Sequence, residues 1–115
     1  MTYNEAIEKL GNRNVRKVGN NTLLLRFPNG NVALRLHNTH ILVFHPNGTV
    51  QVNTGGWRTV TTKARINEYL PCHAGLTQKD FTWYWSTGDG VTFEEGDVVT
   101  AEGHIERANG AAVMI

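Results

Sequence analysis

The sequence has few of the residues that would point to a known chemistry. Its 115 residues include a single cysteine, Cys72, which excludes an internal disulfide and a cysteine-rich zinc site. Only 18% of the residues are charged, so a disordered, highly charged tail is not expected. No apolar run approaches the roughly 20 residues that span a bilayer, and the first residues do not resemble a signal peptide. We expect one small domain over residues 1–115, in a reducing cytoplasm and without a membrane partner.

Carboxylates are absent from the middle of the chain. Not one Asp or Glu lies between Glu8 and Glu68. Residues 1–65 hold nine basic and two acidic side chains, or +7, whereas residues 66–115 hold two basic and eight acidic ones, or −6. A basic surface of this kind is typical of proteins that bind a polyanion. The alternative is that the two parts pack together and neutralise each other, since the halves of a small domain must meet.

One turn occurs twice in the chain, as Phe27-Pro28-Asn29-Gly30 and as His45-Pro46-Asn47-Gly48. Proline presets φ at the second turn position, and glycine accepts the left-handed conformation that follows. Turns of this type close hairpins that contain a bulge. We therefore predict that residues 22–53 form a four-stranded antiparallel meander.

The turns also set a register, in which Leu24 pairs with Leu34, Leu34 with Leu42, and Phe44 with Val50. His40 then lies on the sheet face opposite to His45. One face is apolar except for Arg26 at its end, and consists of Leu24, Val32, Leu34, Leu36, Leu42, Phe44, Val50 and Val52. The opposite face is mixed, with Leu23, Leu25, Phe27, Ala33, Arg35, His37, Ile41, Val43, His45, Gln51 and Asn53.

Short helices flank this meander. Residues 2–10 carry a capping box of Thr2 and Glu5, and the polar, basic stretch that follows reads as a loop. A second helix is expected from Thr61 or Thr62 to Leu70, where Pro71 stops it.

The C-terminal part is read as loop over residues 72–79, an aromatic strand over residues 81–86, and a hairpin that joins residues 91–93 to residues 98–101. Residues 111–115 are expected to add a last strand. The fold class is therefore α+β, an antiparallel meander of two Pro-Asn-Gly hairpins with short flanking helices and a C-terminal hairpin. A partly closed barrel is the alternative.

The segment from Gly55 to Arg65 is the best candidate site. Two glycines allow the backbone to approach a ligand closely, and the helix that begins there favours an anion. Trp57 can stack on a base. The alternative is that the glycines only form a turn, a threonine caps the helix and Trp57 covers the core. With the basic residues of the first half, the predicted nucleic-acid surface is Arg16, Lys17, Arg26, Arg35, Trp57, Arg58, Thr61, Thr62, Lys63 and Arg65.

The mixed face of the meander is a second route to the same function. A sheet face with basic and aromatic side chains can serve as a platform for single-stranded nucleic acid. If helices cover this face, its Leu23, Leu25, Ile41 and Val43 belong to a second core layer instead.

The acidic C-terminal part supports a different hypothesis, in which the protein binds another protein. Aromatic residues on a strand beside carboxylates can act as interface anchors, unless the strand lies in the core. The predicted partner-binding residues are Trp83, Tyr84, Trp85, Glu94 and Glu95.

No pattern indicates an enzyme. The five histidines are not spaced to share a metal ion, and the adjacency of Cys72 and His73 is not that of a nucleophile and its base. No serine triad or pair of catalytic acids is found. We expect no cofactor, no metal and no catalytic residue.

The stretch Leu36-His37-Asn38-Thr39-His40-Ile41, the second turn, and above all Gly55-Gly56-Trp57-Arg58-Thr59-Val60-Thr61-Thr62-Lys63-Ala64-Arg65-Ile66-Asn67 resemble a group of small bacteriophage-encoded proteins. The resemblance covers residues 3–70, and residues 91–96 more loosely. It implies a viral origin, and therefore a location in the cytoplasm of the host cell, but no assigned chemistry. We expect a phage accessory protein that binds nucleic acid mainly by phosphate contacts, or alternatively an inhibitor or adaptor that acts on a host protein.

Overall fold

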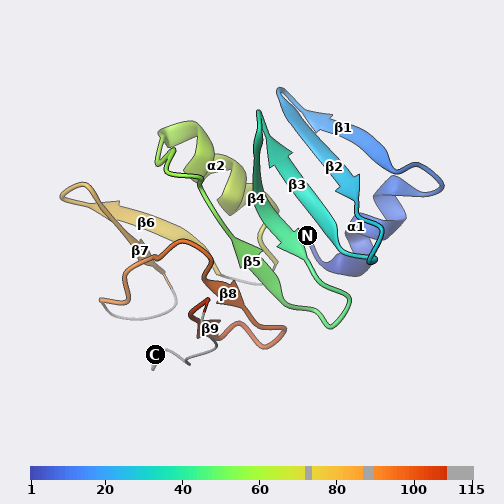
Figure 1. Cartoon of the computed structure of the whole chain (residues 1–115). Helices are drawn as coiled ribbons and strands as arrows, with labels where there is room; N and C mark the ends of the chain where they lie inside the picture. Colours follow the sequence, from blue (N-terminus) through green and yellow to red (C-terminus); the bar gives the residue numbers. More distant parts are fainter. Residues whose placement is uncertain (72–73, 87–89, 109–115) are drawn as a thin grey trace.

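The computed structural model describes residues 1–71, 74–86 and 90–108, and Figure 1 shows how its elements are arranged. Its main sheet is antiparallel, with the strand order β1-β2-β3-β4-β5-β8-β9. These strands are β1 (Val15–Gly19), β2 (Thr22–Arg26), β3 (Val32–Leu36), β4 (Thr39–Phe44), β5 (Val50–Val52), β8 (Val98–Val99) and β9 (Ile105–Glu106). The helices are α1 (Tyr3–Leu10) and α2 (Val60–Tyr69), and a separate hairpin consists of β6 (Leu76–Lys79) and β7 (Thr82–Trp85). The fold class is α+β, as predicted.

The meander has the predicted register. Leu24 pairs with Leu34, Leu34 with Leu42, and Phe44 with Val50. Both Pro-Asn-Gly turns close as expected, with positive φ at Gly30 and Gly48. In the described residues β1 and β9 form the two ends of this strand order, so the sheet is open and the alternative of a barrel is not realised.

The sheet is larger than the sequence predicted. Residues 15–19, read as loop, form β1, which pairs with β2 through Val15 and Leu25. Its side chains are mostly exposed, because β1 is an edge strand of the sheet. The sequence therefore shows no alternation of apolar and polar residues there. At the other edge β8 pairs with β5 and β9, whereas the predicted hairpin joined residues 98–101 to residues 91–93. The predicted strand at 111–115 lies outside the described residues.

A bulge in β4 corrects the predicted faces of Ile41 and His40. The pairing shifts after Leu34, so that His40 pairs with Arg35 and Thr39 with Leu36. The extra residue is Ile41, which is buried in the core, whereas the prediction put it on the mixed face. His40 consequently lies on the same face as Arg35, opposite to the face predicted, because a bulge reverses the alternation beyond it.

Both helices cover the apolar face of the sheet. Helix α1 packs against β2 and β3, while α2 packs against β4 and β6. Ala6 of α1 and Ile66 of α2 join Leu24, Leu34 and Leu42 in one hydrophobic cluster. In Figure 1, α1 is the fainter helix behind β2 and β3. The mixed face, called the outer face below, therefore has neither helix on it.

The helix ends follow local signals. Thr2 and Glu5 form the predicted capping box. Helix α2 begins at Val60, with Thr59 as its N-cap, one or two residues before the expected start, because the Thr59 hydroxyl accepts the N–H of Thr62. Among the described residues no helix is long and apolar enough to cross a bilayer.

The aromatic strand belongs to the core. Trp83 and Trp85 of β7 are each only 1% exposed, whereas Phe81 in the preceding turn is 94% exposed. Their partner strand β6 covers residues 76–79, which were predicted as loop. The hairpin β6–β7 thus closes the end of the core, and the indoles are not available as anchors for another protein.

Candidate functional site

The structure does not gather the predicted basic residues into one surface. Two of them, Arg16 and Arg26, lie at the end of α1. The Arg16 guanidinium donates to the Lys9 carbonyl at 2.6 Å, and that of Arg26 donates to the Gly11 carbonyl at 2.8 Å. Carbonyl groups at the end of a helix lack partners within the helix and carry partial negative charge. These two arginines therefore tie α1 to the sheet.

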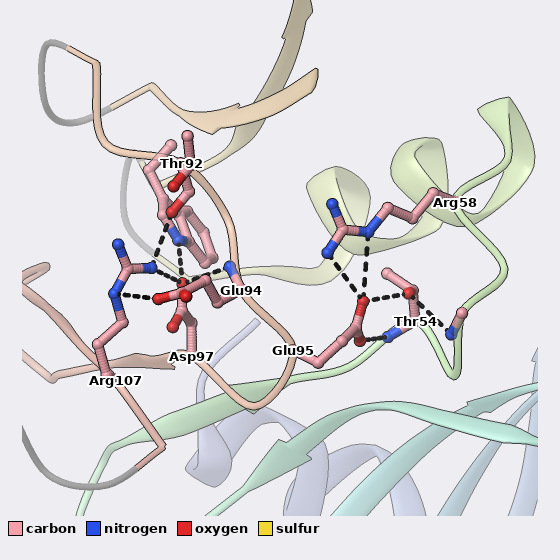
Figure 2. Close-up of polar contacts among 9 residues, drawn as sticks. Thr54, Arg58, Thr92, Glu94, Glu95, Asp97 and Arg107 are labelled. Carbon is pink, nitrogen blue, oxygen red and sulfur yellow. Dashed lines mark hydrogen bonds and ion pairs between the residues drawn. The ribbon is translucent and has the colours of Figure 1, made fainter. Parts of the chain in front are cut away.

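Arg58 is held by a carboxylate (Figure 2). Glu95 accepts the Thr54 N–H at 2.6 Å and the Thr54 hydroxyl at 2.5 Å, and it pairs with Arg58 at 3.3 Å. The Arg58 guanidinium also lies 5.0 Å from the centre of the Phe93 ring. Two residues that the sequence assigned to different functions, Arg58 and Glu95, thus pair with each other.

A second cluster in Figure 2 surrounds Asp97, which is completely buried. One of its oxygens accepts the Trp85 indole N–H at 2.9 Å and the Glu94 N–H at 3.0 Å, and binds Arg107 at 2.8 Å. Arg107 also pairs with the side chain of Glu94 at 2.7 Å. This cluster joins β7, the following loop and the end of the described chain, so Glu94 and Asp97 have a structural role.

The remaining basic residues of α2 are also engaged. Lys63 donates to the side chain of Gln78 at 3.2 Å. Arg65 donates to the Thr22 hydroxyl at 3.1 Å and pairs with Glu68 at 3.4 Å. Burial raises the pKa of nearby Tyr69, with a further contribution from the charge of Glu68.

The outer face keeps its positive charge. Pairing between neighbouring strands places Lys17, Leu23, Arg35 and His40 in one row across β1, β2, β3 and β4. Arg35 is half-buried, its Nε atom is buried without a hydrogen-bond partner, and the described residues offer it no ion pair. No carboxylate can come from these four strands, since none occurs between residues 9 and 67.

An aromatic pair lies on the same face. The rings of Phe27 and His40 meet edge to face, with their centres 5.2 Å apart. Ala33 lies on β3, the strand between them, where it pairs with Leu25 and Val43, and it is fully buried. Leu23, Leu25 and Val43 on this face are half-buried. The outer face therefore combines a cation without a partner, an aromatic pair and apolar side chains.

A pocket of about 470 Å³ lies beside the β3–β4 turn. Its walls come from the end of β3, the start of β4, and the segment that leads into α2. Trp57, Thr61 and Thr62, all in the predicted site, line it. Gly55 does bring backbone close to a neighbour, but that neighbour is Thr39, whose hydroxyl would be 3.0 Å from an added Cβ.

Sequence reasoning missed part of this arrangement. The pocket also uses Leu36, Asn38 and Ile41, and no local pattern relates these residues to Trp57. The place of His40 depends on the bulge, which the sequence does not announce. Among the described residues no group of three or more His, Cys, Asp or Glu side chains is placed to hold a metal ion.

Comparison with known protein families identifies a relative of this chain. A family model described as Kyanoviridae Gp96 protein matches residues 2–100. Neither the curated proteins nor the solved structures contain a match to this chain. The matched residues include α1, the whole meander, α2 and Asp97, whereas Arg107, which pairs with Asp97, lies beyond them.

Proposed function

The chain belongs to the Kyanoviridae Gp96 family of phage proteins, and from this premise we propose that it is a phage accessory protein that binds single-stranded nucleic acid on its outer face. The protein acts without catalysis, in the cytoplasm of the host cell. Phosphate contacts supply most of the affinity, and Lys17 and Arg35 make them.

The observation that carries the proposal is the environment of Arg35. The other arginines of the predicted surface each donate to a carbonyl, a hydroxyl or a carboxylate. Arg35 has no such partner among the described residues, although its Nε atom is buried. A charged group that loses water without gaining a hydrogen bond is costly. An incoming phosphate would give this side chain a counter-ion, because guanidinium and phosphate groups match in charge and geometry.

The rest of the outer face suits a single strand better than a duplex. The Phe27 and His40 rings and the half-buried leucines offer flat, partly apolar surface on which unpaired bases can stack. The bases of a duplex are already stacked, so a duplex would use only the charges. We therefore expect the single strand to bind more tightly than a duplex of equal length.

The alternative function, binding a host protein through the acidic aromatic region, has less support. Trp83 and Trp85 are buried, and the carboxylates of Glu94 and Glu95 are paired with Arg107 and Arg58. Of the residues predicted for that surface, only Tyr84 is half-exposed without a charged partner among the described residues.

The test is fluorescence anisotropy with labelled single-stranded and duplex oligonucleotides at low salt. Arg35→Ala should weaken single-strand binding roughly ten- to a hundredfold, since a hydrogen bond to a charged group contributes about 1.5–3 kcal/mol. Lys79→Ala is the matched control, because it removes an equal charge from an exposed position on the separate β6–β7 hairpin. The proposal is wrong if the protein binds no oligonucleotide, or if both variants lose affinity equally.

A further inference from the structure

The pocket beside the β3–β4 turn has the size and lining of a ligand site. Its volume of about 470 Å³ lies within the range of sites that hold small molecules. Leu36 and Ile41 give it an apolar floor, and both are buried. We propose that this pocket binds a single nucleobase, stacked on Trp57, from a nucleotide of the strand held on the outer face.

Trp57 is the first reason for this assignment. Its side chain is 66% exposed, although tryptophan is highly buried on average in folded proteins. A large indole that lines a pocket without being covered offers a surface for a planar ligand. Stacking on an aromatic ring contributes much of the free energy with which proteins bind an unpaired base.

The polar lining is the second reason. Asn38, Thr39 and Thr61 are among the residues that line the pocket, and the lining that the structure describes includes no Asp, Glu, Lys or Arg. Amides and hydroxyls can bond the edges of a base. Glu95 binds the hydroxyl of the lining residue Thr54, but its charge is paired with Arg58, so it repels the attached phosphate only weakly.

The pocket and the outer face share one hairpin end. The pair Leu36–Thr39, which lines the pocket, is next to the pair Arg35–His40 on the outer face. Successive pairs of a sheet point to opposite sides. A strand that contacts Arg35 therefore needs only to cross the turn at His37 and Asn38 to place one base in the pocket. In this form the inference rests on the proposed function.

The experiment follows Trp57 fluorescence while free nucleoside monophosphates, a normal oligonucleotide and an oligonucleotide with abasic sites are titrated in separate arms. Trp83 and Trp85 are buried, so quenching is expected from Trp57, and its loss in Trp57→Phe verifies the source. Trp57→Ala should weaken binding of the normal oligonucleotide roughly tenfold. Val60→Ala is the control, because Val60 lies between the lining residues Thr59 and Thr61 but is 78% exposed and is not part of the pocket lining.

The outcomes separate this inference from the proposed function. Quenching by the normal oligonucleotide but not by the abasic one supports base binding, and quenching by free nucleotides shows that the pocket suffices. If Arg35→Ala weakens oligonucleotide binding while Trp57→Ala does not, the outer face stands and the pocket inference is wrong. If free nucleotides quench Trp57 but no oligonucleotide binds, the proposed function and this use of the pocket both fail. Equal quenching by the abasic and the normal oligonucleotide also overturns the assignment.

Discussion

Three donors from separate parts of the chain share the buried carboxylate of Asp97. The Trp85 indole, the Glu94 backbone and the Arg107 guanidinium all meet it within 3.0 Å. Asp97 has no contact with solvent, and its other oxygen has no hydrogen-bond partner in the described part of the chain, so these three donors stabilise its charge. A buried pair of this kind adds little net stability compared with apolar packing, but breaking it exposes the full cost of the remaining charge.

Asp97→Ala should therefore destabilise the protein by about 3–5 kcal/mol, because Arg107 and the Trp85 N–H lose their partner. Chemical denaturation measures the loss. Glu94→Ala is the control, since its side chain is 62% exposed and such a pair contributes no more than about 1 kcal/mol. Similar losses for both variants would show that Asp97 is not the centre of this cluster.

Glu5 makes the stability depend on pH. Hydrogen bonds from the Thr2 backbone and side chain, and the charge of the N-terminus, lower the pKa of Glu5 below 4.5. Because the pKa is lower in the folded state, the contribution of this carboxylate is complete above pH 4.5 and is lost as the pH falls through the folded-state value. Glu5→Gln should lower stability at neutral pH, and its difference from the natural chain should shrink in acid. Denaturation at a series of pH values tests this, and a constant difference would contradict it.

At the scale of elements, the two hairpins show how one sequence signal acts in two surroundings. In both turns the amide of Asn29 or Asn47 accepts an N–H two residues on, at 3.0 Å. The glycines have nearly the same φ, 92° at Gly30 and 93° at Gly48. They differ in what surrounds them, because an added Cβ at Gly48 would lie 3.1 Å from the Ala101 Cβ, whereas Gly30 faces open space.

Gly30→Ala and Gly48→Ala form a matched pair of variants. Both should lose stability by about 1–2 kcal/mol from the left-handed backbone, and Gly48→Ala should lose more because its neighbour must move. Thermal or chemical unfolding of the two variants gives the comparison. An equal loss would mean that the contact between this turn and Ala101 yields easily.

For the whole molecule, the division of charge in the sequence is mostly resolved by contact. Arg58 pairs with Glu95, Arg65 with Glu68, and the helix end takes Arg16 and Arg26. The second half neutralises some of the cations, which agrees in part with the alternative of mutual neutralisation, while Lys17 and Arg35 remain on the outer face without an ion pair among the described residues. In the structure, the basic surface predicted from the sequence is reduced to a small patch on the outer face.

This patch sets the salt dependence. Two phosphate contacts predict a slope of about −1.4 for the logarithm of the binding constant against that of the salt concentration on single strands. About five contacts, as a surface made from most of the predicted basic residues would make, would give about −3.5. Anisotropy titrations at several salt concentrations measure the slope. A value near −3.5 would place the strand elsewhere than on the outer face.

The sequence was most informative where the signal is local. The Pro-Asn-Gly turns set the register of four strands, and the capping box began α1, because turns and caps depend on a few neighbouring residues. The candidate site was predicted less well. Trp57, Thr61 and Thr62 do lie together, but their neighbours Asn38 and Ile41 come from a distant hairpin.

The amino-acid sequence alone determined the class of the fold, the pairing in the meander outside the β4 bulge, and the absence of carboxylates from β1 to β4, because these depend on local conformation and on composition. Tertiary structure alone decided which cations stay free. Arg35 and Arg58 both lie in the part of the sequence that has no carboxylates. The fold brings Glu95 of the second half against Arg58 and leaves Arg35 without a partner among the described residues. Pairing of charges is a property of distance in space, which no spacing along the chain specifies.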